Sequence, residues 1–457
     1  MRIFKQHKIA GRTGLMTGNL AASGFVQERK RMNVSRPELA EGHIPHLFLM
    51  LVTTLIMVLA TIKPVSGQSL DSLYKEALET NPGVQAQYQK FEALMQKSAA
   101  VSGMPSPQLS LGYFINPIET RVGPQRAQIG LSQQFPWFGT LKAKESAVAY
   151  QAEAQFQKFE EAKLKLYADL SRAYYPLVEW SEKLKILESE KALLKELRQQ
   201  AIFQQESGNA SSVDVIRADL LIDDINTEID ILKAERSALQ SQLNELINKE
   251  ETFKIEPTDS LNRAFSLSGS DRESMKNHPA VKRYEQEQKA FAEQENAATK
   301  AGLPQIGVGI NYFVVTERSD AQLPKNGQDA LLPQLSISLP IYRKQYRAAR
   351  KEAIHLQKAA EFEAQHEVNQ LQSELDNVLF AIDREMKLIA LYKTKIGKAE
   401  MAVELLLDQY QNGQTDYEEV LRLQSKLFDF KLKELESAKK LNIKQSELIY
   451  LTNDLTK

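Results

Sequence analysis

The sequence of 457 residues contains no cysteine. Disulfides, thiolate metal sites, cysteine nucleophiles and a lipid-modified N-terminal cysteine are therefore excluded. Charge of one sign is not in excess either, because 58 Lys and Arg stand against 59 Asp and Glu. A general nucleic-acid-binding protein normally carries a basic excess, so no nucleic-acid partner is expected. Nucleotide-binding loops, zinc motifs and nucleophile elbows are absent too, and we expect neither an enzyme nor a bound cofactor or metal.

Long hydrophobic runs are scarce, and the only clear one lies near the start of the chain. Residues 47–62 form an apolar run of 16 residues inside a basic leader with nine Lys and Arg and three Asp and Glu. The run is followed by Val65-Ser66-Gly67. This pattern predicts a signal peptide over residues 1–67, with an uncleaved membrane anchor as the alternative. An exported chain with no second such run is periplasmic, secreted or inserted in the outer membrane as a β-barrel.

The remaining chain contains an internal repeat. Asn81-Pro82 recurs as His278-Pro279 and Pro107-Gln108 as Pro304-Gln305, both at an offset of 197 residues; Gly208 recurs as Gly413 at an offset of 205. These landmarks predict a first repeat over residues 68–250, a linker over residues 251–270 and a second repeat over residues 271–457. Each repeat is expected to contain a helix, a β-hairpin and a long helical hairpin, with the β-hairpins at residues 106–134 and 304–339.

The helical hairpins are expected to be long coiled coils. Residues 140–205 and 342–411 have Pro176 and Gly397 as their only Pro and Gly, and apolar residues recur at steps of three and four. At 1.5 Å per residue, about 70 helical residues extend over roughly 105 Å. Gly208 and Gly413 suit the left-handed position that ends a helix, and Ser212 and Asp416 can cap the helices that return.

The two short hairpins show a period of two, which is typical of strands with one apolar and one polar face. The polar face carries Gln, Ser, Gly and Asn without charge, which suits a water-filled lumen, although ordinary hairpins packed on a helical layer are the alternative. We therefore predict a transmembrane antiparallel β-barrel. Its lipid-facing residues are expected to be Leu109, Leu111, Tyr113, Ile129, Leu131, Ile306, Val308, Ile310, Leu335 and Ile337.

Four strands cannot close a barrel on their own. Open strand edges in lipid would leave backbone groups unpaired, at a cost of several kcal/mol each. The chain must therefore oligomerise to span a membrane, and the strand number allows a dimer with eight strands or a trimer with twelve.

The ordered landmarks resemble the TolC-like outer-membrane efflux proteins over nearly the whole chain after the leader. The marks are Ala77-Leu78-Glu79-Thr80-Asn81-Pro82, Asn277-His278-Pro279 and the Tyr410-to-Tyr417 segment around the second turn. The resemblance implies an α+β fold with a helical barrel and a twelve-stranded β-barrel, formed by a homotrimer. It also implies a periplasmic adaptor and an inner-membrane pump of the RND type as partners. The adaptor would dock at the helical turns, at Gly208, Asn209, Gly413, Gln414 and Asp416.

In that family, acidic side chains just past the turns narrow the periplasmic entrance. The matching positions hold Asp214 and Glu419, whereas Arg217 and Arg422 stand where the family can carry a second acid. The resemblance thus implies either a gate or an Arg–carboxylate latch between neighbouring helices. An ordinary capping and solvated charge cluster is the alternative interpretation.

These features together indicate the outer-membrane channel of a tripartite efflux system. The channel would be a passive conduit for small molecules or metal ions, with energy supplied by the pump. The segment Gln134-Phe135-Pro136-Trp137-Phe138-Gly139 resembles members associated with heavy-metal efflux. Two alternatives remain at this point: a periplasmic coiled-coil adaptor or scaffold, and an outer-membrane channel for type I protein secretion.

Overall fold

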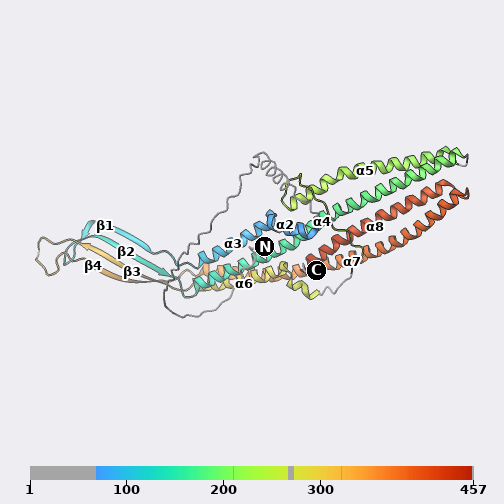
Figure 1. Cartoon of the computed structure of the whole chain (residues 1–457). Helices are drawn as coiled ribbons and strands as arrows, with labels where there is room; N and C mark the ends of the chain where they lie inside the picture. The colour runs from blue at the N-terminus through green and yellow to red at the C-terminus, as the bar shows by residue number, and fades with distance from the viewer. Residues whose placement is uncertain (1–67, 209, 266–271, 321, 455–457) are drawn as a thin grey trace, which may run out of the picture. The chain divides into compact units, whose positions relative to one another are not determined.

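The structure is a computed structural model that describes residues 68–208, 210–265, 272–320 and 322–454 (Figure 1). All of these lie in the second of two units of the chain, Val65–Lys457. The expected leader over residues 1–67 lies outside them. The helices are α2 (Leu70–Thr80), α3 (Pro82–Val101), α4 (Thr140–Glu206), α5 (Ser212–Leu246), α6 (Pro279–Ala301), α7 (Lys344–Gln411) and α8 (Tyr417–Thr452), with a short 3₁₀ helix η1 (Arg272–Asn277). The strands are β1 (Gln108–Ile118), β2 (Gln125–Phe135), β3 (Gln305–Val315) and β4 (Ala330–Ser338).

None of the helices within the described ranges combines the length and the apolar character that crossing a membrane would require.

The predicted duplication is visible in matching contacts at the start of each half. Asn81 caps α3, and its side-chain amide donates to the Leu246 carbonyl at 2.8 Å. At the equivalent position, the Nδ1 atom of His278 accepts from the Ala280 N–H, while Nε2 lies 3.0 Å from the Tyr450 carbonyl oxygen. Each capping residue thus joins the start of one helix to the end of the returning helix of its own half. Two different residues make the same contact because both present a short donor and acceptor pair.

The long helices form as the sequence predicts, and α4 continues through Pro176. Both turns use Gly in the left-handed region, with φ of 78° at Gly208 and 69° at Gly413, as expected. The cap predicted at Ser212 is wrong by one residue. Ser211 is the N-cap of α5, and with Asp214 it forms a reciprocal capping box. Asp416 occupies the N-cap position of α8, but its side chain makes no capping hydrogen bond.

The four strands form one antiparallel sheet in the order β1-β2-β3-β4. The central pair, β2 and β3, joins the two halves of the chain, with Leu131 opposite Ile310 and Gly130 opposite Asn311. Directly opposite residues of an antiparallel pair share one face, so the register separates an apolar face from a polar face. Strands β1 and β4 are the two edges of the sheet.

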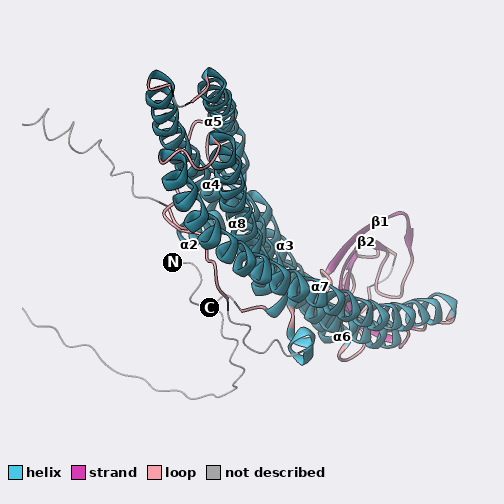
Figure 2. Cartoon of the chain, turned by 90° about the vertical axis from the view of Figure 1, so that its right-hand side faces the viewer, coloured by secondary structure: helices cyan, strands magenta, loops and turns pink. Residues whose placement is uncertain are grey.

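Each level of the described unit is four elements wide. Beside the sheet the helices pack in the order α3-α4-α6-α7, and toward the turns in the order α5-α4-α8-α7 (Figures 1 and 2). Helix α4 is central because it contacts α3, α5, α6 and α8. One edge of the layer is thus formed by β1, α3 and α5, and the other edge by β4 and α7.

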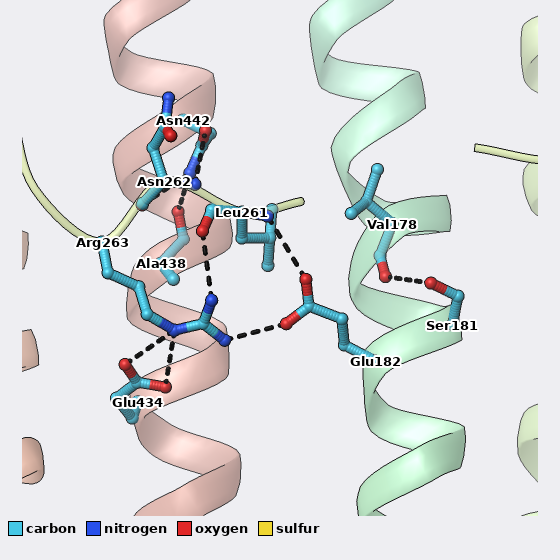
Figure 3. Close-up of polar contacts among 9 residues, drawn as sticks. All are labelled: Val178, Ser181, Glu182, Leu261, Asn262, Arg263, Glu434, Ala438 and Asn442. Carbon is cyan, nitrogen blue, oxygen red and sulfur yellow. Dashed lines mark hydrogen bonds and ion pairs between the residues drawn. The ribbon is translucent and has the colours of Figure 1, made fainter. Parts of the chain in front are cut away.

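The segment after α5 fastens α4 to α8 within the layer (Figure 3). The guanidinium of Arg263 donates to Glu182 on α4 at 2.8 Å and to Glu434 on α8 at 2.9 Å. The backbone of residue 262 exchanges two hydrogen bonds with the Asn442 side chain, and the backbone N–H of the buried Leu261 donates to Glu182. We call residues 261–263 the strap. The region expected to be only a linker therefore holds the two halves together.

Candidate functional site

The apolar face of the sheet is exposed in the single chain. Nine of the ten residues predicted to face lipid are exposed, including Leu111 at 74% and Leu335 at 68%, and Ile306 is half-buried. The ladder places Leu109 opposite Leu131, Leu131 opposite Ile310, and the remaining predicted residues in the same register. A continuous apolar surface of this kind requires a non-aqueous partner.

The opposite face of the sheet is polar and without charge along its centre. Asn311 accepts from Gln128 Nε2 at 3.0 Å and donates to Gln334 Oε1 at 3.1 Å, which links three strands through their amide groups. Gly130 makes room for this row, because a Cβ there would lie 2.5 Å from Asn311 Oδ1 and 2.4 Å from Ser110 Oγ. The small residues of this face thus leave space for a line of amides that can contact water.

At the other end of the helices, Arg217 joins the two helical hairpins. Its guanidinium lies 3.2 Å from Asp214 on its own helix and 2.8 Å from Glu418 Oε2 on α8. Asp214 also accepts from the Ser211 N–H at 3.3 Å, so this carboxylate serves the capping box and the ion pair at once. Arg217 thus forms an ion pair between neighbouring helices, Asp214 also makes the contact of an ordinary cap, and the gate role of these residues stays a prediction.

The two other predicted gate residues pair with each other. Arg422 donates to Glu419 at 2.7 Å, and both belong to the start of α8. Both side chains are exposed, and an exposed pair one turn apart contributes about 0–1 kcal/mol. This pair adds little to helix packing, and both charged groups face solvent in the single chain.

Two buried tyrosines, Tyr410 and Tyr417, lie near Asp214. The rings of Tyr410 and Tyr417 are 5.0 Å apart between centroids, and both side chains are buried. Among the described residues, neither hydroxyl has a hydrogen-bond partner. Burial, followed by the nearby Asp214 carboxylate, raises the pKa of Tyr410; burial, Tyr410 and Asp214 raise the pKa of Tyr417. The hydroxyls therefore stay neutral, and the end of α7 and the start of both returning helices meet at this pair.

The residues expected to dock an adaptor lie where the helices reverse. Gly208, Gly413, Gln414 and Asp416 are all exposed. Asn209 lies outside the described residues. Their docking role stays a prediction.

Sequence reasoning missed Glu418, Tyr410 and Tyr417. Glu418 is adjacent to Glu419, and spacing from the turn glycine could not show which of the two carboxylates faces α5. The tyrosines had a signal, since they flank the second turn in the segment already singled out. Two aromatic residues, one just before and one just after a helical turn, are placed to pack against each other between the two helices.

Within the described part of the chain, no three or more His, Asp or Glu side chains are grouped to hold a metal ion.

The exposed apolar face of the sheet and the long helices beyond it define the class of a membrane-inserted β-sheet protein with a helical extension. The family model of the outer membrane efflux proteins matches residues 73–247 and 272–454, and the chain belongs to this family. Its place is therefore the outer membrane, and it is a channel protein rather than an enzyme. No curated protein sequence matches the chain.

Solved structures of outer-membrane channels share the fold. CusC, described as forming a transmembrane channel, is 17% identical, with 85% of this chain and 92% of CusC covered at a TM-score of 0.69. The outer-membrane channel OprN is 18% identical, with 85% and 90% covered and a TM-score of 0.67. The open state of the MtrE channel from Neisseria gonorrhoeae is 18% identical, with 84% and 88% covered and a TM-score of 0.67.

Proposed function

We propose that three copies of this chain form a closed conduit across the outer membrane and the periplasm. The observation that carries the proposal is the layer of four elements with two unlike free edges. A contact between unlike edges is heterologous, and repeating it closes a ring when the rotation fits. Three copies give twelve strands, which leave a lumen, whereas two copies give eight, whose interior side chains fill.

The two helical edges support this assembly. On α5, Val213, Ile216 and Leu220 are exposed, and on α7, Met401 and Leu405 are exposed. Counted from the turns, Ile216 and Leu220 lie at nearly the same height as Leu405 and Met401. Apolar stripes on two unpartnered helix faces favour packing of α5 on α7 of the next copy. The edges β1 and β4 would pair in the same ring, which satisfies their backbone groups.

The proposed conduit is passive and works in a tripartite efflux system. A periplasmic adaptor would contact the exposed turns at Gly208 and Gly413, and an inner-membrane pump, of the RND type, would supply the energy. The cargo would be small molecules, drugs or metal ions, which pass along the uncharged amide row of the barrel. The same architecture would also serve type I protein secretion, and the pump that co-purifies with the chain decides between the two.

The gate of this conduit would lie at the turns. Asp214, Arg217, Glu419 and Arg422 gather there together with Glu418, and the bond from Arg217 to Glu418 ties α5 to α8. Loss of that bond would let the second helical hairpin move outward from the first. Glu419 and Arg422 would supply charge at the entrance rather than hold it closed.

Reconstitution of the mature protein in planar bilayers tests the proposal. We expect discrete conductance steps from wild-type protein, a larger or more frequently open conductance from Arg217→Gln, and a changed conductance from Asp214→Ala combined with Glu419→Ala. Lys433→Gln is the matched control, because Lys433 pairs with Asp429 only within the exposed face of α8. Absence of any conductance from correctly folded protein would refute the conduit. Unchanged conductance in both gate variants would remove these residues from the gate.

A further inference from the structure

A dense group of cations surrounds the helix ends next to the sheet. Residues 137–145, 295–302 and 342–352 contain eight Lys and Arg and three Asp and Glu, a net charge of +5. Contacts bring the three segments together. Lys300 Nζ lies 3.4 Å from the Gly139 carbonyl oxygen, and a Cβ on Gly302 would lie 3.3 Å from Tyr346 Cβ. We call the Lys and Arg side chains of these segments the basic collar.

Most of the basic collar is not neutralised by the protein. Lys142 pairs with Glu145 at 3.3 Å and Arg350 with Glu295 at 2.9 Å. Among the described residues no carboxylate forms an ion pair with the other exposed cations, which are Lys144, Arg343, Lys344, Arg347 and Lys351. Several of these stand in the first turns of α4 and α7, neither of which has an acidic residue there. Cations at helix N-termini oppose the helix dipole, so local helix stability does not explain their position.

The other end of the sheet has no such excess. Residues 119–126 and 316–329, which include the loops β1-β2 and β3-β4, contain four Lys and Arg and four Asp and Glu. Arg318 there is paired with Asp320 at 2.7 Å. The positive charge is therefore confined to the side of the sheet from which the helices continue.

Exposed apolar side chains lie between the basic collar and the sheet. Phe138 is 81% exposed and Tyr342 is 86% exposed, and Leu339 and Ile341 beside them are exposed as well. Trp137 packs edge-on against Phe138 at 6.2 Å between ring centroids. Aromatic side chains followed by Lys and Arg match the depth order of a membrane interface, where rings sit at the headgroup level and cations meet the phosphates.

We propose that the basic collar binds the phosphate groups of anionic phospholipids in the leaflet that faces the periplasm. This inference rests on the proposed insertion of the sheet in the membrane. The lipid would bind at the end of the sheet from which the helices continue. The phosphates supply the negative charge that the carboxylates of the chain do not supply to these cations. Trp137 and Phe138 fix the depth at which the contact is made.

Energy transfer from Trp137 to labelled lipid tests the proposal. Mature protein is placed in vesicles that contain labelled phosphatidylglycerol or, in parallel, labelled phosphatidylcholine, and the signal lost in Trp137→Phe is assigned to Trp137. Trp180, the other tryptophan, lies about 60 Å further along α4 at 1.5 Å per residue and supplies the background. We expect phosphatidylglycerol to be preferred around Trp137 at low salt. The preference should fall about fivefold or more in Lys344→Gln/Arg347→Gln/Lys351→Gln, and also at high salt.

The controls separate this inference from the proposed function. Lys393→Gln/Lys398→Gln/Lys426→Gln removes three exposed cations from the distant parts of α7 and α8 and should leave the preference unchanged. Transfer to both lipids with equal efficiency would overturn the lipid site and leave the conduit intact. Transfer to neither lipid would contradict membrane insertion itself. A triple variant that dissociates into monomers and keeps its lipid preference would place these cations between copies of the chain and would also overturn the site. Inorganic phosphate that competes as well as the lipid would point to a free anion instead.

Discussion

At the scale of single residues, the two capping positions show how one structural role is filled by two chemistries. Asn81 and His278 stand at equivalent points of the repeat, and both precede a proline that begins a helix. His278 is completely buried and needs its neutral form, since Nδ1 accepts a hydrogen bond and Nε2 faces a carbonyl oxygen. Burial lowers the pKa of His278 from 6.5 to about 4.

This shift predicts a loss of stability in mild acid. The unfolded chain binds a proton at His278 as pH falls through about 6.5, whereas the folded chain resists protonation down to about pH 4. Stability should therefore decrease over this interval by up to about 3 kcal/mol and then level off. His278→Asn copies the solution of the first repeat and should remove this part of the pH dependence. Thermal unfolding in detergent at about pH 7 and about pH 4 measures the difference.

His355→Asn is the control for that measurement, because His355 is exposed on α7. It should leave the pH dependence as in wild type. If His278→Asn and wild type lose the same stability in acid, the protonation of His278 does not drive the loss.

Residue-scale features were only partly predictable from sequence. The turn glycines followed from the rule that a helix end often needs a left-handed residue, and both have positive φ. Two details depend on a shift of one residue along a helix. They are the use of Ser211 rather than Ser212 as N-cap, and of Glu418 rather than Glu419 as the partner of Arg217. A single position rotates a side chain by 100° around a helix, and spacing rules do not resolve that difference.

At the scale of elements, the strap is the feature that sequence analysis did not foresee. A stretch containing Pro257 and Gly269 between two repeats indicates a linker, and such stretches normally run over the surface. Here three consecutive residues bind both α4 and α8, and Leu261 is buried between them. Local sequence carries no sign of this contact, because the partners Glu182 and Glu434 are distant in the chain.

Arg263→Gln should destabilise the junction between α4 and α8. The substitution leaves Glu434, which is buried, and Glu182 facing each other without their shared cation. We expect a loss of about 1–3 kcal/mol, reduced by the partial exposure of Arg263. Denaturant unfolding measures the loss. Adding Glu434→Gln to Arg263→Gln should recover part of it, and a double variant no more stable than the single one would contradict the interpretation.

Long elements were the most predictable part of the fold. The helical hairpins and four strands follow from periods of 3.6 and two that persist over many residues, so single exceptions such as Pro176 do not obscure them. The lateral order of the helices could not be read from sequence, since it depends on which faces of α4 meet α5, α6 and α8. That order creates the two free edges on which the proposed assembly depends.

At the scale of the whole molecule, the edges predict a charge-sensitive assembly. Leu220→Lys or Leu405→Glu should each disrupt the proposed trimer, because a charge buried between α5 and the α7 of the next copy would lack a partner. Combining both substitutions in one chain should restore assembly in part, since each junction then carries one charge of each sign. Size-exclusion chromatography with light scattering in detergent measures the oligomer. Leu220→Ala, which adds no charge, should remain trimeric, and monomers or dimers from wild-type protein would contradict the ring.

The meeting of β2 and β3 at the centre of the sheet also fixes an order in time. Residue 130 on β2 pairs with residue 311 on β3, which follows it by about 180 residues in the chain. The pairing of β2 with β3 therefore forms only after more than half of the chain that follows β2 has been synthesised and exported. Until β3 arrives, the edge of β2 that will pair with it has unpaired backbone groups and the hairpin exposes an apolar face. Both features favour aggregation. We therefore expect the chain to need a chaperone that covers the first hairpin until β3 is available for pairing.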